Sequence, residues 1–347
     1  MAGKKTTTRK TAATQRAAKP IASRPAKKGA RDPQASPVME KAAPAEMNDA
    51  PSVPFPVVGI GASAGGLEAL TEFFRAMRTP CGMAFVVITH LDPDHKSALT
   101  EILSHITPMP VSEVSDGVEL LTDRVYVIPP NMNMEVEGDR LHLAPRREMR
   151  GPHMPIDVFL RSLAIARKSR AVGVILSGTA TDGTLGLKAI KGEGGITFAQ
   201  DDTAKHGGMP RSAVNAGCVD FVLPPARIAD ELSRLGAHPY LNGGLFAGPS
   251  TAPVEKEEND FDTVVRLLSA AVGVDFTHYK PPTLRRRIER RMVLSKQPTL
   301  KAYAQYLKDE PAELQALYQE VLIQVTGFFR DPEMFVSLRE TVFPKLL

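Results

Sequence analysis

A serine lies in a short glycine-rich segment directly after an apolar run. The run 57–60 is followed by Gly61-Ala-Ser63-Ala-Gly65, which has the pattern Gly-x-Ser-x-Gly. A nucleophilic serine on a sharp strand-to-helix turn needs small neighbours, because the backbone must bend and a carbonyl group must approach the hydroxyl. The first N–H groups of a following helix can stabilise the developing oxyanion. The same glycines are also compatible with a dinucleotide-binding loop or with close packing alone.

A histidine and an aspartate occupy comparable places further along the chain. His90 follows the apolar run 85–88, and Asp182 lies in the polar segment after the run 172–176. A neutral imidazole can take the proton of a serine hydroxyl, and a carboxylate can hold that imidazole in the required tautomer. Taken singly, His90 could be structural and Asp182 could cap the helix expected at 183–190. Together with the serine they indicate a hydrolase whose order Ser, His, Asp differs from that of the α/β-hydrolases, chymotrypsin and subtilisin.

Residues 55–235 alternate short apolar runs with helical patterns. This alternation predicts an α/β fold, a doubly wound, mostly parallel sheet with helices on both faces. Ligands bind at the carboxyl ends of such strands, so Ser63, His90 and Asp182 are expected together at one edge. The runs 125–128 and 141–143 flank a turn-rich stretch and are expected to form a hairpin. The other expected strands are 172–176, 196–199 and 221–223, and the expected helices are 67–77, 97–105, 156–167, 184–190 and 211–215.

The chain of 347 residues divides into four parts by composition. Residues 1–53 are low in complexity and are expected to be a disordered tail, because they cannot bury enough apolar surface to offset their ordering entropy. Residues 54–236 are the expected α/β domain. Residues 237–258 are the expected linker, because they are rich first in Gly, Pro and Ala and then in Glu and Lys. Residues 259–347 show helical patterns throughout, which predicts a small all-α domain.

The net charge of +4 hides an asymmetry between the tail and the rest of the chain. Residues 1–31 hold ten Lys/Arg and no acidic residue, so residues 32–347 carry a net charge of −6. A basic arm of this kind could contact nucleic acid or an acidic membrane surface, or it could merely keep the chain soluble. The two cysteines exclude a disulfide scaffold and a cysteine-based zinc site, and a cytoplasmic location is expected.

Several of these segments resemble the catalytic domain of the chemoreceptor glutamate methylesterases (CheB). The resemblance covers residues 55–235. The segments that carry it are Ile60-Gly-Ala-Ser63-Ala-Gly-Gly66, the strand ending in His90, Val127-Ile-Pro-Pro130, His153-Met-Pro-Ile-Asp157, Leu176-Ser-Gly-Thr-Ala-Thr-Asp182-Gly183 and Gly208-Met-Pro-Arg-Ser-Ala213. The family often carries a histidine after the Pro-Pro turn, where this sequence has Asn133.

The resemblance implies an activity and a site. The family hydrolyses methyl esters of glutamates on the cytoplasmic helices of chemoreceptors and deamidates certain glutamines there, without a cofactor or metal. Its catalytic triad corresponds to Ser63, His90 and Asp182, and its oxyanion donors correspond to the backbone N–H groups of Ala64 and Thr179. The family commonly has a receiver domain ahead of the esterase, where this chain has the basic tail.

Residues 260–347 resemble the N-terminal helical region of the chemoreceptor methyltransferases (CheR). The carriers are Gly273-Val-Asp-Phe-Thr-His-Tyr-Lys280, Leu284-Arg-Arg-Arg-Ile-Glu-Arg-Arg291 and Val325-Thr-Gly-Phe-Phe-Arg-Asp-Pro-Glu-Met-Phe335. The resemblance places Thr326 and Arg330 at one edge of an S-adenosylmethionine pocket. The glycine-rich motif that grips this cofactor would follow Leu347. We therefore expect a CheB–CheR fusion that ends before its transferase domain and does not methylate.

An arginine-rich surface is expected on the helix at 284–291. Helical spacing puts Arg286 with Arg290 and Arg287 with Arg291 on adjacent strips. This surface could dock acidic receptor helices or simply be solvated. Nucleic acid is not expected as a partner except through the basic tail, because no aromatic residues interleave these arginines. An alternative to the enzyme is a non-catalytic signalling adaptor whose two domains dock receptors.

Overall fold

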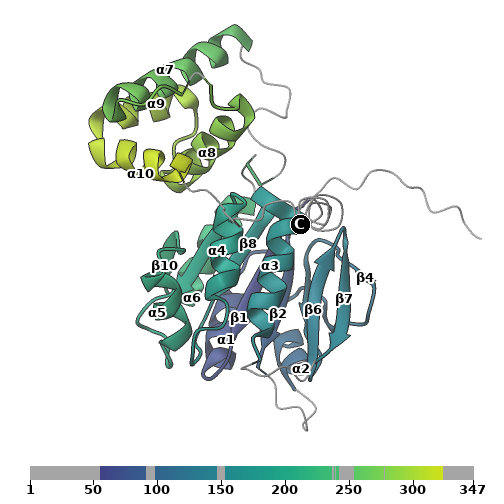
Figure 1. Ribbon diagram of the computed structural model, residues 1–347. Coiled ribbons are helices and arrows are strands. Elements are labelled where there is room, and N and C mark those ends of the chain that lie inside the picture. Colours follow the sequence, from purple (N-terminus) through teal and green to yellow (C-terminus); the bar gives the residue numbers. More distant parts are fainter. Residues whose placement is uncertain are drawn as a thin grey trace, which may run out of the picture. The chain divides into compact units, whose positions relative to one another are not determined.

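A parallel sheet forms the centre of the chain in a computed structural model (Figure 1). The structure describes residues 55–90, 98–146, 153–236, 238, 240–241, 254–276 and 278–322. Within them a sheet of seven parallel strands has the order β10-β9-β8-β1-β2-β5-β3. The expected doubly wound sheet is thereby confirmed, and the expected tail 1–53 lies outside the described residues. The strands are β1 (Val57–Ala62), β2 (Ala84–Thr89), β3 (Val111–Glu113), β5 (Arg124–Val127), β8 (Ala171–Ile175), β9 (Ile196–Gln200) and β10 (Phe221–Leu223).

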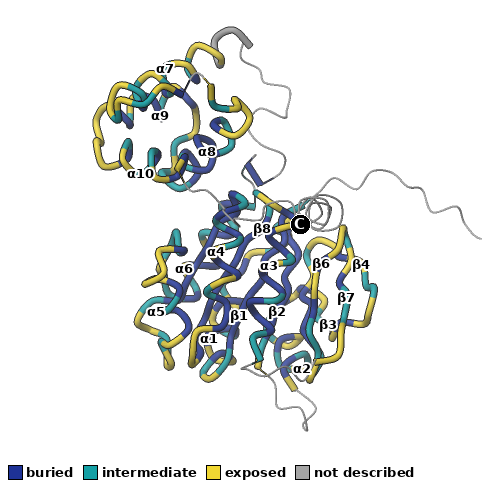
Figure 2. Tube along the Cα trace, in the orientation of Figure 1, coloured by how far each residue is buried: buried dark blue, intermediate teal, exposed yellow. Residues whose placement is uncertain are grey.

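Helices cover both faces of this sheet, as the apolar strands predict. One face packs on α1 (Gly66–Ala76), α2 (Leu99–Ser104) and α6 (Pro225–Gly236). The other face packs on α3 (Pro155–Arg167), α4 (Thr184–Gly192) and α5 (Gly208–Asn215). The central strands are buried along their whole length between these two layers (Figure 2). Among the described residues, no helix is both long and apolar enough to cross a membrane.

Strand β1 uses its two faces differently. Val58, Ile60 and Ala62 lie in the core on the side of α1. On the other side stand Gly59 and Gly61, where an added Cβ would lie only 2.6 Å from Leu160 Cδ2 and 2.5 Å from Ile156 Cγ2, respectively. Because these positions have no side chain, α3 lies close against β1. This close packing places the first turn of α3 beside the carboxyl ends of the central strands.

The turn-rich region after β5 departs from the expected hairpin. Strand β5 joins the main sheet, parallel to β2, and the run 141–143 belongs to a second sheet. That sheet is antiparallel and consists of β4 (Val118–Glu119), β6 (Met132–Glu137) and β7 (Arg140–Pro145). The expected pairing was wrong because β6 was missed. Its alternation of buried Met134 and Val136 with exposed Glu135 and Glu137 is the period of a strand.

The C-terminal described part is all-α, as expected, with a core of its own. Its helices are α7 (Val254–Val272), α8 (Pro281–Leu294), α9 (Leu300–Asp309) and α10 (Pro311–Leu322). The predicted linker 237–258 differs from the structure at both ends. Tyr240 and Leu241 are buried in the core on the α1 side of the sheet, and α7 begins within the segment at Val254. The rich Gly and Pro content hid these two apolar residues.

Two arginines of α8 lie in a buried ion-pair network. Arg290, with none of its surface exposed, pairs with Asp220 and with Glu320 of α10 at 2.7 Å. Arg287, 4% exposed, pairs with the same Glu320 at 3.0 Å and donates to the carbonyl of Gly192 at 2.8 Å. Burial alone would raise the pKa of Asp220, but the neighbouring Arg290 and Lys191 cations hold it below its ordinary value.

We expect Arg290→Ala to lower the free energy of unfolding by about 3–5 kcal/mol, because it removes the buried cation that two buried carboxylates share. Urea unfolding monitored by circular dichroism measures this change. The matched control is Arg266→Ala on the exposed side of α7, with an expected change within about 0.5 kcal/mol. Equal, small effects of both substitutions would contradict a structural role for the network.

Candidate active site

Ser63 lies on the turn between β1 and α1, as its sequence pattern predicts. The turn needs its second glycine, because Gly65 has φ 73° and caps α1 in the left-handed conformation. A Cβ there would also lie 2.7 Å from the hydroxyl oxygen of Ser177. Ser63 is half-buried, and its N–H donates to the carbonyl of Ser177 at 2.9 Å. Its hydroxyl is therefore presented at the carboxyl end of β1 by a turn that larger residues could not form.

His90 lies between Ser63 and Asp182 and is within hydrogen-bond distance of both. Its Nδ1 lies 3.1 Å from Ser63 Oγ, and its Nε2 lies 2.8 Å from Asp182 Oδ2. The strands that precede these residues, β2, β1 and β8, are neighbours in the sheet, so the expected meeting at one edge is confirmed. The carboxylate accepts the proton on Nε2, which leaves the Nδ1 lone pair to accept the serine hydroxyl.

Asp182 is fully buried and is held by the backbone of α3. Its Oδ1 accepts from the Asp157 N–H at 2.9 Å, and its Oδ2 accepts from the Ile156 N–H at 3.1 Å. The positive end of the helix dipole lies at this first turn and stabilises a negative charge there. The sequence suggested that Asp182 could cap the helix at 183–190. Asp182 does accept from the N–H groups of a helix start, but the helix is α3 and not α4. α4 has Gly183 as its N-cap, with no side-chain cap.

Asp157 performs the reciprocal role and was missed from the sequence. It is 5% exposed, and its Oδ1 accepts from the Gly186 N–H in the first turn of α4 at 2.7 Å. Burial raises the pKa of Asp157; the hydrogen bond from Gly186 opposes that rise, and the nearby charge of Asp182 adds to it. Asp182, just before α4, therefore caps α3, and Asp157, in the first turn of α3, caps α4. An Asp two residues after a proline that starts a helix was the available signal.

Ser177 joins the loops around the serine and was also missed. Its hydroxyl donates to the carbonyl of Ala64 at 2.8 Å and accepts from the His206 N–H at 3.0 Å. Its own N–H donates to Oε1 of Gln200 at 2.9 Å. One buried side chain thus connects the turn after β1 with the loops after β8 and β9. The turn that presents Ser63 is fixed from outside as well as by its glycines.

The expected oxyanion donors, Ala64 and Thr179, are both exposed. Within the described residues, neither backbone N–H donates a hydrogen bond to another group of the chain. The loop that carries Thr179 lies against the serine, since a Cβ on Gly178 would be 3.0 Å from the Cβ of Ser63. Both N–H groups are therefore available to bind a ligand oxygen.

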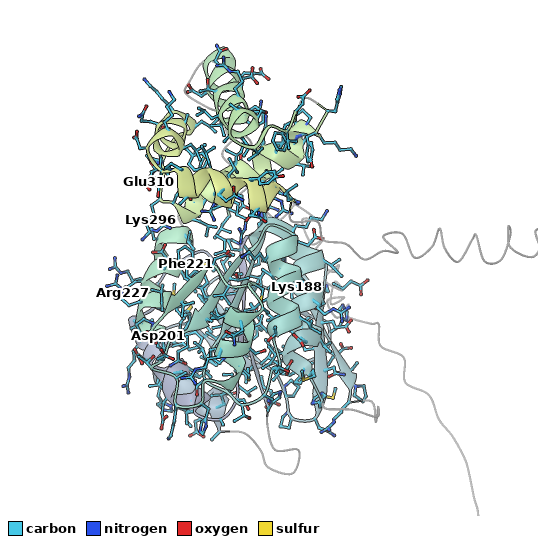
Figure 3. The ribbon with its side chains drawn as sticks, turned by 60° about the vertical axis from the view of Figure 1, so that its left-hand side comes forward. Lys188, Asp201, Phe221, Arg227, Lys296 and Glu310 are labelled. Atoms are coloured by element: carbon cyan, nitrogen blue, oxygen red, sulfur yellow. The ribbon has the colours of Figure 1, made fainter. Side chains whose placement is uncertain are left out.

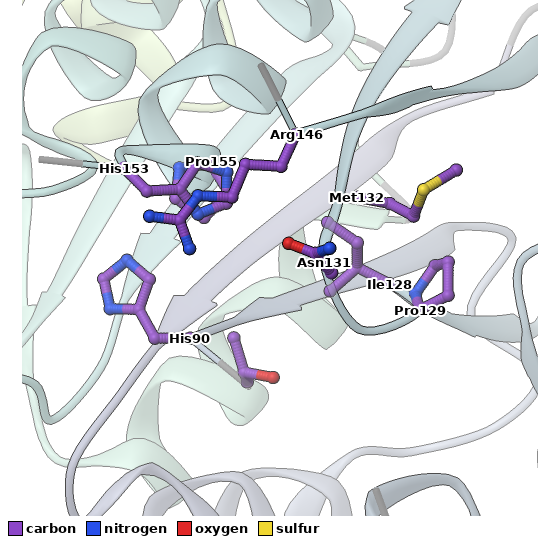
Figure 4. Close-up of a pocket in the computed structure, with 9 residues that line it drawn as sticks. His90, Ile128, Pro129, Asn131, Met132, Arg146, His153 and Pro155 are labelled. Atoms are coloured by element: carbon purple, nitrogen blue, oxygen red, sulfur yellow. The ribbon is translucent and has the colours of Figure 1, made fainter. Parts of the chain in front are cut away.

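Two cavities flank the His90 ring and share Thr89 and His90 in their walls. The first, of about 270 Å³, contains Ser63 and is otherwise apolar, with Leu67, Leu70, Ala98, Leu99 and Ile102 in its wall. The second, of about 210 Å³, lies beneath Arg146 and His153 (Figure 4). The serine therefore faces an apolar space, and a separate, more polar space adjoins the histidine.

Comparison with known proteins places this site in a family. The model of the CheB methylesterase family matches residues 58–232, which is half of the chain. The chain belongs to the CheB methylesterase family. The model of the all-alpha domain of the CheR methyltransferases matches residues 259–322. The chain is thus a CheB domain followed by a CheR-type helical domain, as the sequence resemblances predict.

Individual relatives and a solved structure match different shares of this chain. An uncharacterized 104.1 kDa protein of Rhodobacter capsulatus is 40% identical over 267 residues, which are 72% of this chain and 28% of that protein. Protein-glutamate methylesterase/protein-glutamine glutaminase 2 of Burkholderia pseudomallei is 36% identical over 200 residues, 57% of this chain and 58% of that enzyme. The crystal structure of the CheB methylesterase catalytic domain of Thermotoga maritima has 29% identity and a TM-score of 0.49, covering 53% of this chain and all of that one. The chain thus spans little more than half of the Burkholderia enzyme and a smaller part of the Rhodobacter protein.

The expected docking surface on α8 is wrong for most of its arginines. Arg287 and Arg290 are buried in the ion-pair network, and Arg291 pairs with Glu313 at 2.6 Å. Arg286 is half-buried. Helical spacing shows that these side chains share a strip of the helix, but it does not show that the strip faces solvent. Here the buried carboxylates of α10 pair with three of these arginines. The expected cofactor residues Thr326 and Arg330 lie outside the described residues.

We expect Asp182→Asn to lower the turnover number about 10³–10⁴-fold, because an amide cannot both accept from the α3 N–H groups and hold the His90 tautomer. It should also lower the melting temperature, since the buried α3 cap loses its charge. Steady-state kinetics and thermal denaturation of the same preparation measure both effects. The matched control is Asp202→Asn, an aspartate whose side chain is 92% exposed. Unchanged turnover of Asp182→Asn would leave Asp182 as a helix cap alone.

Proposed function

We propose that this chain hydrolyses methyl esters of protein glutamyl side chains and deamidates protein glutaminyl side chains. The observation that carries the proposal is the continuous hydrogen-bond path from Ser63 through His90 to the buried carboxylate of Asp182. A serine, a base and an orienting acid at these distances are the requirements of nucleophilic acyl transfer. The names of the Burkholderia enzyme and of a Paramagnetospirillum magneticum relative, 36% identical over 183 residues, support both activities.

The reaction proceeds in two acyl transfers. Ser63 Oγ attacks the ester carbonyl carbon while His90 Nδ1 takes the hydroxyl proton. The tetrahedral intermediate then collapses, the bond to the methoxy group breaks, and His90 returns the proton so that methanol leaves. Water attacks the resulting acyl-serine in the same way, which releases the glutamate carboxylate and restores Ser63. With a glutaminyl side chain the leaving group is ammonia. Water is the sole co-substrate, and the esterase reaction uses no cofactor.

The Ala64 and Thr179 N–H groups are the proposed oxyanion donors. Their freedom from other hydrogen bonds within the described chain supports this role. A single such donor contributes about 3–4 kcal/mol to the stability of a transition state. Because both donors belong to the backbone, their contribution depends on loop position and not on side-chain type. Ser177, which holds the Ala64 carbonyl, is accordingly a positioning residue.

The proposed substrate is a helical segment of a chemoreceptor, in a chemotaxis-type signalling system of the cytoplasm. The apolar cavity beside Ser63 has the character needed for the methylene groups of an esterified glutamate. S-adenosylmethionine would enter only with a transferase domain, so we propose no methyl transfer by residues 1–347. The basic tail remains a candidate for contact with nucleic acid or an acidic surface.

We expect Ser63→Ala to reduce methanol release from methylated receptor to background, because the nucleophile is lost. Removing His90 as well should lower the rate of methanol release little further, since the three residues act as a unit. Release is measured by gas chromatography, with circular dichroism to confirm folding. The matched control is Ser112→Ala, an exposed serine of β3 away from the site, which should retain the wild-type rate.

Two results would contradict the proposal in different ways. A folded wild-type chain that releases no methanol and no ammonia would favour the signalling adaptor. A Ser63→Ala variant as active as the wild type would show hydrolysis by other groups.

A further inference from the structure

The second cavity beside His90 plays no part in the steps above. Its polar lining residues are Thr89, His90, Asn131, Arg146 and His153, and its apolar lining residues are Ile128, Pro129, Met132 and Pro155 (Figure 4). We call it the Arg146 pocket. None of these lining residues is acidic, and among the described residues no carboxylate forms an ion pair with Arg146. Among the described residues that line it, the pocket therefore combines a cation with no acidic side chain.

The small antiparallel sheet positions this cation. The N–H of Arg146, just after β7, donates to the carbonyl of Asn131, just before β6, at 3.2 Å. Asn131 has φ 57°, a left-handed conformation that asparagine tolerates better than most residues. His153 is held from the same hairpin, with Nε2 2.8 Å from Asn133 Oδ1. The hairpin of β6 and β7 thus anchors both basic residues at the catalytic edge.

The charge of the pocket resides on Arg146. Burial lowers the pKa of His153, and the nearby cation of Arg146 and the His90 ring lower it further, which favours the neutral form of His153. Figure 4 shows the Arg146 guanidinium directed into the space between the His90 and His153 rings. A guanidinium presents paired N–H donors that match the two oxygens of a carboxylate.

We propose that the Arg146 pocket binds the carboxylate of a second acidic side chain, close to the esterified glutamate on the same protein segment. This inference rests on the proposed function and names its substrate class as an acidic segment. The pocket and the serine cavity share Thr89 and His90 in their walls, and we infer that two neighbouring side chains of one substrate occupy them together. On a helical substrate, side chains three or four positions apart share a face.

Paired peptide esters test this inference on the full chain. Each pair carries one glutamate methyl ester and differs only in a Glu or Ala placed three or four positions before or after it. Ala is the neutral comparator, because Gln is itself a proposed substrate. For at least one placement, kcat/KM of the wild type should favour the Glu peptide about tenfold, through KM, and added salt should weaken the preference.

Substitutions of Arg146 show whether this side chain causes the preference for the Glu peptide. Arg146→Gln should remove it, and Arg146→Lys should keep part of it, because the charge remains without the planar fork. The matched control is Arg227→Gln on the exposed side of α6 (Figure 3), which removes the same charge elsewhere and should retain the preference. Equal losses on both peptides in Arg146→Gln, or a wild type with no preference at any placement, would overturn the inference.

A binding measurement separates this inference from the proposed function. Fluorescence anisotropy with the Ser63→Ala variant compares Kd for the same peptide pairs without turnover. The Ser63→Ala variant should bind a Glu peptide more tightly than its Ala partner, and the double variant Ser63→Ala, Arg146→Gln should not. This result would support the pocket even if the wild type hydrolysed no ester. If the acidic residue changed neither Kd nor kcat/KM, the proposed role of the pocket would be contradicted. Hydrolysis of either peptide would still support the esterase activity.

Discussion

The Asp182 carboxylate is the interaction on which the geometry of the site depends. One buried side chain accepts from the Ile156 and Asp157 N–H groups and also from the imidazole of His90. A fully buried carboxylate is stable only where such donors replace water. α3 can supply them because Gly59 and Gly61 let it approach β1 closely. The packing of the sheet and the orientation of the base are therefore parts of one arrangement.

Charge is distributed differently at the two edges of the sheet. Gly195 and Asp220, which contact Arg290, precede β9 and β10, at the edge opposite to Ser63. Arg287 and Arg290 at that edge are neutralised within the fold and are unsuited to binding an external partner. Arg146 at the catalytic edge has no such neighbour among the described residues. This difference is the reason why we place the proposed acidic segment at the catalytic edge.

Much of the architecture followed from the sequence, and the omissions have identifiable causes. Long apolar runs such as 57–60 and 172–176 gave correct strands, because only a parallel sheet buries such runs on both faces. The two-residue β4 and the three-residue β3 are too short for any period to show. β6 was hidden by the turn residues around it, and α6 by the prolines that precede it. β3 and β4 thus depend on their tertiary contacts, whereas β6 and α6 carry the period of their own type of element.

Residue types and their places after the apolar runs were enough to identify the side chains that could carry the chemistry. Each of Ser63, His90 and Asp182 follows a buried strand, and parallel strands end at a common edge, so their meeting was predictable. The tertiary structure alone decided which helix Asp182 caps, that Asp157 and Ser177 support the site, and that the arginines of α8 are buried. These outcomes depend on partners distant in the sequence. Periodicity places a side chain on a face of its own element, whereas burial and pairing depend on what packs against that face.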